Sequence, residues 1–95
     1  MRFIVLPEAQ ADLASIRESR AAFSEQAAEN LAFALLRRMS RIQEFPRAGR
    51  RIPEFQVEYL REVLEQGYRI MYEVFVDRVE VFGIVSSRQD IRPPR

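Results

Sequence analysis

Residues 57–86 read VEYLREVLEQGYRIMYEVFVDRVEVFGIVS, and this stretch decides the fold. β-branched and aromatic residues dominate it, and two short polar segments interrupt it, which is typical of consecutive strands. The pattern predicts strands over 57–64, 68–76 and 79–86, joined by a tight loop at 65–67 and a turn at 77–78. Strands joined by such short connections form an antiparallel β-meander.

Two helices are predicted ahead of the meander. Pro7 suits the first turn of a helix over 7–19, because its missing N–H is not needed there. Ser24 is the expected N-cap of a second helix over 25–44, and Pro46 ends that helix. The core stripe of the second helix is expected at Ala28, Leu31, Leu35, Met39 and Ile42. The short link between the helices predicts an antiparallel hairpin.

The remaining segments complete an α+β fold. A β-branched and aromatic run over 2–6 predicts a first strand, and the proline- and arginine-rich stretch 46–54 predicts an ordered loop. We expect one domain over residues 1–95, because this length holds a single core. It comprises an N-terminal strand, an antiparallel helix hairpin and a three-stranded antiparallel β-meander, in one sheet with the helices on one face. The tail, 88–95, is expected to be loose at its end.

Composition limits the available chemistry. The chain has no Cys and no His, which excludes disulfides, thiol nucleophiles and metal sites built on either residue, so we expect no metal and no cofactor. No apolar run approaches the roughly 18 residues that span a bilayer, and we expect a cytoplasmic protein. All 15 basic residues are Arg. A GC-rich genome explains this usage, and so does a need for planar groups that grip phosphates or carboxylates.

The strand register predicts where the arginines of the meander point. If Val76 pairs with Val79, one sheet face is almost wholly apolar and lies under the helices, while the other is mixed. For the loop at 65–67 we favour three residues, which pairs Leu64 with Tyr68. A two-residue loop would bury an unpaired Arg61, at a cost of several kcal/mol. In the favoured register Glu62 falls on the apolar face and must escape at an edge.

Three arginines, Arg61, Arg69 and Arg88, then converge on the open face of the predicted sheet. Such a cluster can bind phosphate oxygens or a carboxylate-rich partner. If it does, charge reversal at Arg61 or Arg69 abolishes activity and leaves the fold intact. The alternative is that each arginine forms an ordinary surface salt bridge with one nearby acidic residue, at Glu62, Glu73 or Glu80.

Several short motifs follow one another along the chain. They are PEAQADL at 7–13, FPRAGR at 45–50, Pro53-Glu54, LREV at 60–63, GYRIMY at 67–72, and the ending Ser87-Arg88-Gln89-Asp90. In type and order they resemble the RelE/ParE superfamily of type II toxin–antitoxin systems, and its ParE-like branch in particular. The resemblance covers nearly the whole chain. It implies the α+β fold of that superfamily and a small toxin encoded beside an antitoxin.

Two activities occur among the relatives that the resemblance implies. RelE-like toxins cleave mRNA in the ribosome without a metal, using basic residues of the sheet and a C-terminal tyrosine. ParE-like toxins inhibit DNA gyrase and are not known as nucleases. Arg61, Arg69 and Arg88 match or lie near the basic positions of RelE-like enzymes, so they are the catalytic candidates for an endoribonuclease. They are otherwise candidates for target binding, together with Glu73. No Tyr or His follows Tyr72, which favours the non-enzymatic gyrase inhibitor.

The resemblance also implies a cognate ParD-like antitoxin, bound in a heteromeric complex. A contiguous exposed apolar area marks such an interface, and an antitoxin tail that folds on binding would cover it. The candidate contacts lie off the core stripe of the second helix or on the open sheet face, at Phe33, Leu36, Met71, Phe75, Phe82 and Ile84. Alternatively the C-terminal tail or a homodimer contact covers this area, or the chain is a non-toxic interaction module.

Overall fold

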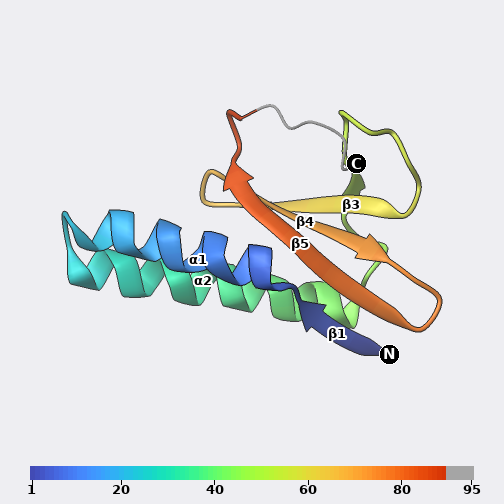
Figure 1. The fold of residues 1–95 in the computed structure, drawn as a ribbon, viewed down its shortest axis with the longest axis horizontal. Coiled ribbons are helices and arrows are strands. Elements are labelled where there is room, and N and C mark those ends of the chain that lie inside the picture. The colour runs from blue at the N-terminus through green and yellow to red at the C-terminus, as the bar shows by residue number, and fades with distance from the viewer. Residues whose placement is uncertain (90–95) are drawn as a thin grey trace.

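The computed structural model describes residues 1–89, and the predicted loose end of the tail lies outside the described residues. The elements in chain order are β1 (Arg2–Val5), α1 (Pro7–Ala21), α2 (Glu25–Glu44), β2 (Arg50–Arg51), β3 (Leu60–Glu65), β4 (Tyr68–Val74) and β5 (Arg78–Ser86). The strands form a five-stranded sheet in the order β1-β5-β4-β3-β2 (Figure 1). Within residues 1–89, β1 and β5 are the one parallel pair. The predicted α+β class is confirmed, with β2 as an additional strand.

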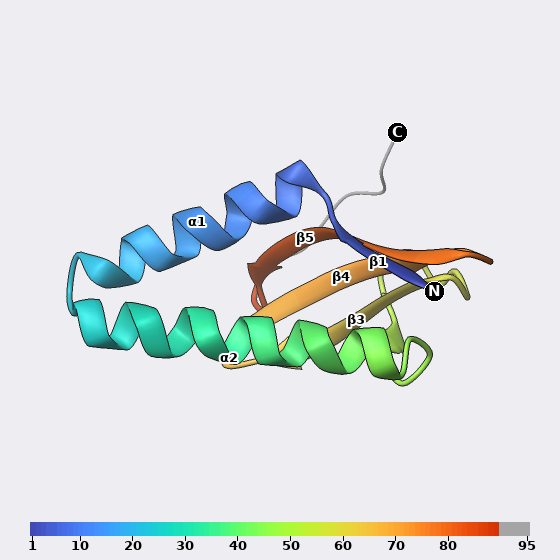
Figure 2. The same ribbon diagram turned by 90° about the horizontal axis from the view of Figure 1, so that it is seen from below.

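Helix α2 has the bounds and the buried side that its sequence predicts. The Ser24 hydroxyl accepts a hydrogen bond from the Ala27 amide at 3.1 Å, which satisfies one of the amides that a helix start leaves free. Its buried residues are the five of the expected stripe: Ala28, Leu31, Leu35, Met39 and Ile42. Helix α1 is two residues longer than predicted and ends at Ala21. Figure 2 shows the two helices antiparallel and side by side, as expected.

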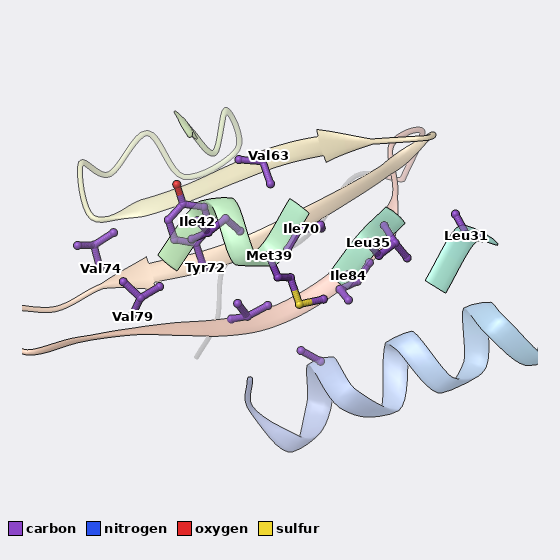
Figure 3. Close-up of a cluster of buried hydrophobic side chains, with 12 residues drawn as sticks. Leu31, Leu35, Met39, Ile42, Val63, Ile70, Tyr72, Val74, Val79 and Ile84 are labelled. Atoms are coloured by element: carbon purple, nitrogen blue, oxygen red, sulfur yellow. The ribbon is translucent and has the colours of Figure 1, made fainter. Parts of the chain in front are cut away.

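The core lies between the helix hairpin and the inner face of the sheet. Leu31, Leu35, Met39 and Ile42 of α2 face side chains from β3, β4 and β5, including Tyr72 (Figure 3). Helix α1 contributes Ala9 and is joined to β5 by Asp12, whose Oδ2 accepts a hydrogen bond from the Ile84 amide at 2.9 Å. This link between α1 and the sheet was not predicted from the sequence.

The β3–β4 hairpin has a two-residue loop, so the predicted three-residue loop is wrong. Glu65 pairs with Tyr68, and the loop residues Gln66 and Gly67 have φ angles of 48° and 84°. Two successive positive φ angles are the geometry of the type I′ turn, which joins strands most tightly. The longer loop was favoured because a two-residue loop was expected to bury an unpaired Arg61. The one-residue difference moves every side chain of β3 to the opposite face.

The β4–β5 register also differs from the prediction. Val74 rather than Val76 pairs with Val79, so the turn is centred on Val76-Asp77 and Val76 is fully exposed. A β-bulge opposite Met71 and Tyr72 then adds one residue to β5. A bulge reverses the inward and outward alternation beyond it. Ile84 is therefore in the core, and Val85, predicted to be in the core, pairs with Arg69 on the open face.

Candidate functional site

Arg69 lies in the middle of the open sheet face and is bound by two carboxylates. Its two terminal nitrogens donate to the two oxygens of Glu54 at 2.7 and 2.6 Å, and its Nε donates to Glu62 Oε1 at 2.7 Å. A further hydrogen bond reaches the Gln89 carbonyl at 3.0 Å. The hydrogen bonds to Glu54 raise the pKa of Arg69 above its ordinary value, against the opposing effect of burial. The guanidinium is buried, and each of its three nitrogens donates to a group of this chain.

Glu62 is the centre of this arrangement and is completely buried. Its Oε2 accepts a hydrogen bond from Arg50 Nε at 2.7 Å, while Oε1 accepts the one from Arg69. The prediction that Glu62 falls on the apolar face is wrong, because the two-residue turn places it on the open face. We call Arg50, Glu54, Glu62 and Arg69 the sheet network. It holds two positive and two negative charges and is neutral as a unit.

Arg61 does not share a face with Arg69, so the predicted convergence of three arginines is wrong. It pairs with Tyr72 across β3 and β4, on the side of the sheet that faces the helices. Its Nη1 donates to the Gly49 carbonyl at 2.7 Å, and its Nε donates to the Glu58 carbonyl at 3.0 Å. The expected cost of burying Arg61 does not arise, because loop carbonyls and the Glu58 carboxylate serve as its partners.

The loop at 46–49, whose carbonyls accept hydrogen bonds from Arg61, is also held by Tyr72 from the core side of the sheet. Its hydroxyl donates to the Pro46 carbonyl at 2.6 Å and accepts a hydrogen bond from the Gly49 amide at 3.2 Å. A Cβ at Gly49 would lie 2.3 Å from that hydroxyl oxygen and 2.8 Å from the Glu62 carbonyl, so only glycine fits there. The proline–glycine–arginine loop at 46–50 is therefore held against the sheet by Tyr72, the second tyrosine of the GYRIMY strand.

The other two target-binding candidates, Arg88 and Glu73, are more accessible. Arg88 is exposed, and within residues 1–89 its side chain makes no hydrogen bond or ion pair. Glu73 is half-buried and lies opposite Glu80 across β4 and β5. Burial and the Glu80 charge raise the pKa of Glu73, and Arg78 partly offsets them. Arg78 donates to Glu80 at 2.7 Å.

The apolar candidates separate into exposed and buried residues. Phe33 and Leu36 project from α2 and are 62% and 50% exposed. Met71 and Ile84 are buried, so the expectation that they form part of an exposed surface is wrong. The bulge turns Ile84 inward, and the Gly83 position leaves room for Met71. The half-buried aromatics of the predicted set are Phe75 and Phe82.

A hollow that the sequence did not predict lies at the end of the β4–β5 hairpin. It has a volume of about 660 Å³, and its lining includes Phe45, Val74, Phe75 and Val76. We call it the hairpin hollow. Phe45 is 56% exposed and ends α2, so the turn and the helix end together form one apolar surface. In the sequence, the one sign of this exposed apolar surface was the apolar Val76 next to the polar pair Asp77-Arg78.

The described residues carry neither a metal site nor a membrane span. Within residues 1–89, no three acidic, His or Cys side chains are grouped so as to hold a metal ion. No helix in the same range combines the length and the apolar character needed to cross a bilayer.

The chain combines a helix hairpin packed on one face of a mixed five-stranded sheet with a loop that is hydrogen-bonded to the sheet tyrosine Tyr72. The family described as "ParE toxin of type II toxin-antitoxin system, parDE" matches residues 3–91. The chain therefore belongs to the ParE toxin family, and it is a ParE-type toxin of a ParDE type II toxin–antitoxin system.

A solved structure supports this fold. It is that of the "Chromosomal ParDE TA system from P. aeruginosa", with a TM-score of 0.77. The two chains share 18% sequence identity over 90% of this chain and 95% of that one, so the likeness concerns the fold. A search of curated proteins finds no match.

Proposed function

We propose that this toxin inhibits DNA gyrase in the cytoplasm and is neutralised by a cognate ParD-like antitoxin. The observation that carries the proposal is the family match, which spans residues 3–91 and includes every described helix and strand except the first residue of β1. Inhibition by binding requires an accessible surface and no catalytic group. We treat residues 1–95 as one toxin domain.

Two apolar surfaces support the proposed antitoxin contact. Phe33 and Leu36 form an exposed ridge on α2, on the side away from the core stripe. The hairpin hollow, with Phe75 in its lining, is the second surface. An amphipathic antitoxin helix can cover a ridge of this kind, and large apolar side chains can fill the hollow.

For target binding we propose Arg88 as the direct contact on the open face. It is the arginine of the predicted cluster that is exposed and has no side-chain partner within residues 1–89. Arg61 and Arg69 contribute by holding the loop and the sheet in place, because their donors are already used by this chain. Charge reversal at either position would therefore disrupt the fold, contrary to the expectation from the sequence.

The test is DNA gyrase supercoiling with the purified toxin, scored also for trapped cleaved DNA. We expect inhibition that the antitoxin reverses. Arg88→Glu should weaken inhibition at least tenfold, while the matched charge reversal Arg20→Glu, at the exposed end of α1, should leave it unchanged. Full inhibition by Arg88→Glu would remove Arg88 from the contact.

Lack of inhibition by the wild-type toxin would contradict the gyrase target. Cleavage of mRNA on ribosomes would then identify a RelE-type endoribonuclease. Inactivity in both assays, with normal antitoxin binding, would identify a non-toxic interaction module.

A further inference from the structure

Three arginines gather on the side of α2 that faces the β3–β4 turn. Arg37, Arg38 and Arg41 lie within five consecutive residues, and Arg37 and Arg41 are one helical turn apart, or about 6 Å along the axis. They line a hollow of about 480 Å³ that also involves Ser40, Glu65 and Gln66. We call this surface the α2 arginine hollow. It lies on the opposite side of the sheet from the sheet network.

The arginines of this hollow are weakly paired. Arg38 is 3.9 Å from Glu65 and Arg41 is 3.8 Å from Glu44, in contrast to the 2.6–2.7 Å contacts of Arg69. Arg37 makes no ion pair within the described residues, and its guanidinium lies 5.8 Å from the Phe33 ring centre. Glu65 is the one acidic residue in the lining, so the hollow carries a net charge of +2.

The lining indicates the chemistry of the ligand. Guanidinium groups match phosphate oxygens in geometry as well as in charge, and hydroxyl and amide groups such as those of Ser40 and Gln66 also bind phosphates. No aromatic ring from residues 1–89 lines the hollow, although single-stranded nucleic acids are bound by stacking their bases on such rings. It also lacks the large apolar side chains typical of the centre of a protein interface.

We propose that the α2 arginine hollow binds the phosphate backbone of a nucleic-acid duplex. Each strand of a DNA duplex carries one phosphate per ~3.4 Å of axis, so arginines one helical turn apart can reach phosphates on the same strand. The contact is independent of base sequence, because contacts to phosphates carry no sequence information. This binding goes beyond gyrase inhibition, since it requires neither gyrase nor the antitoxin.

The test measures binding of the full-length toxin to short labelled duplexes of DNA and of RNA, by fluorescence anisotropy at several salt concentrations. The variant is Arg37→Gln/Arg38→Gln/Arg41→Gln. The matched control is Arg2→Gln/Arg20→Gln/Arg51→Gln, which removes the same charge from exposed arginines without ion pairs that are scattered over the described residues. Circular dichroism and urea unfolding check that both variants are folded.

We expect the plot of log affinity against log salt to lose about 0.9 in slope for each phosphate contact removed, or roughly 2–3 for the triple variant. For the control variant, the slope should fall by less than about 0.9, the amount that one phosphate contact contributes. DNA and RNA duplexes both present a phosphate backbone. The duplex that the toxin binds more tightly identifies which of the two nucleic acids is the ligand.

Three results would overturn the proposal. One is wild-type toxin that binds neither duplex at low salt. Another is equal loss in the variant and the control, which would indicate only a general charge effect. The third is unchanged duplex binding combined with weaker antitoxin or gyrase binding by the triple variant, which would make the hollow a protein site. Because the assay contains no gyrase, its outcome is separate from that of the supercoiling assay.

Discussion

The arginines on the two sides of the molecule have opposite electrostatic environments. In the sheet network, Arg69 is 5% exposed in its side chain and is bound by Glu54 and Glu62 at 2.6–2.7 Å. In the α2 arginine hollow, Arg38 and Arg41 are 36% and 66% exposed, and their nearest carboxylates are 3.8–3.9 Å away. The residue type is the same, but all three side-chain nitrogens of Arg69 already bind groups of this chain, whereas those of Arg38 and Arg41 are available.

This difference shows that an arginine in a family motif need not be a ligand-binding residue. Arg61 and Arg69 lie in the motifs on which the resemblance to ParE toxins rests, yet both bind groups of their own chain. A phosphate would have to displace Glu54 to reach Arg69. Arg37, Arg38 and Arg41 lie outside those motifs and make no such contacts.

The largest effect that separates the two regions is expected from Glu62→Gln. The substitution keeps the shape of the side chain but removes the buried negative charge between Arg50 and Arg69. Removing one partner of a buried ion pair costs about 3–5 kcal/mol, because the other charge stays buried. The free energy of unfolding in urea measures this loss. A loss below about 1 kcal/mol would show that the network is no stronger than a surface salt bridge.

A much smaller effect is expected from Glu73→Gln, on the same sheet. Burial and the Glu80 charge raise the pKa of Glu73, so the folded state binds a proton that the unfolded state has released. The wild type therefore loses stability as pH rises from the ordinary carboxyl pKa through the raised one. Gln does not titrate. The variant should be more stable at neutral pH by less than ~1 kcal/mol, the range for like charges opposite each other in a sheet.

Urea unfolding of both proteins at about pH 4 and about pH 7 measures this difference. The gain from Glu73→Gln should be present at the higher pH and shrink at the lower one. A gain of equal size at both values would indicate a packing effect rather than a titration. Loss of stability at neutral pH would contradict the raised pKa.

The helices could be predicted from the sequence because their signals are local. The apolar stripe of α2 recurs at steps of three and four residues, Ser24 caps its start, and Pro46 follows its end. Each signal acts within one or two turns, so no knowledge of distant contacts was needed. The class of the fold followed from the order of these elements.

The site could not be predicted, because it depends on the strand register. A two-residue turn at Gln66-Gly67 and a bulge opposite Met71 each shift the pairing by one residue, and each shift exchanges the two faces. Glu54 adds a partner from a loop 15 residues away from Arg69 in the chain. The partners of Arg61 are mostly backbone carbonyls, which no side-chain pattern reveals.

The arginines of the sheet network are proposed to stabilise the fold, whereas those of the α2 arginine hollow are not. The most direct test of this claim is urea unfolding of Arg69→Gln beside Arg41→Gln. We predict a loss of about 3–5 kcal/mol for Arg69→Gln, which leaves Glu54 and the buried Glu62 without their shared partner, and a change within about 0.5 kcal/mol for Arg41→Gln. Equal unfolding midpoints and slopes for the two variants would contradict the claim.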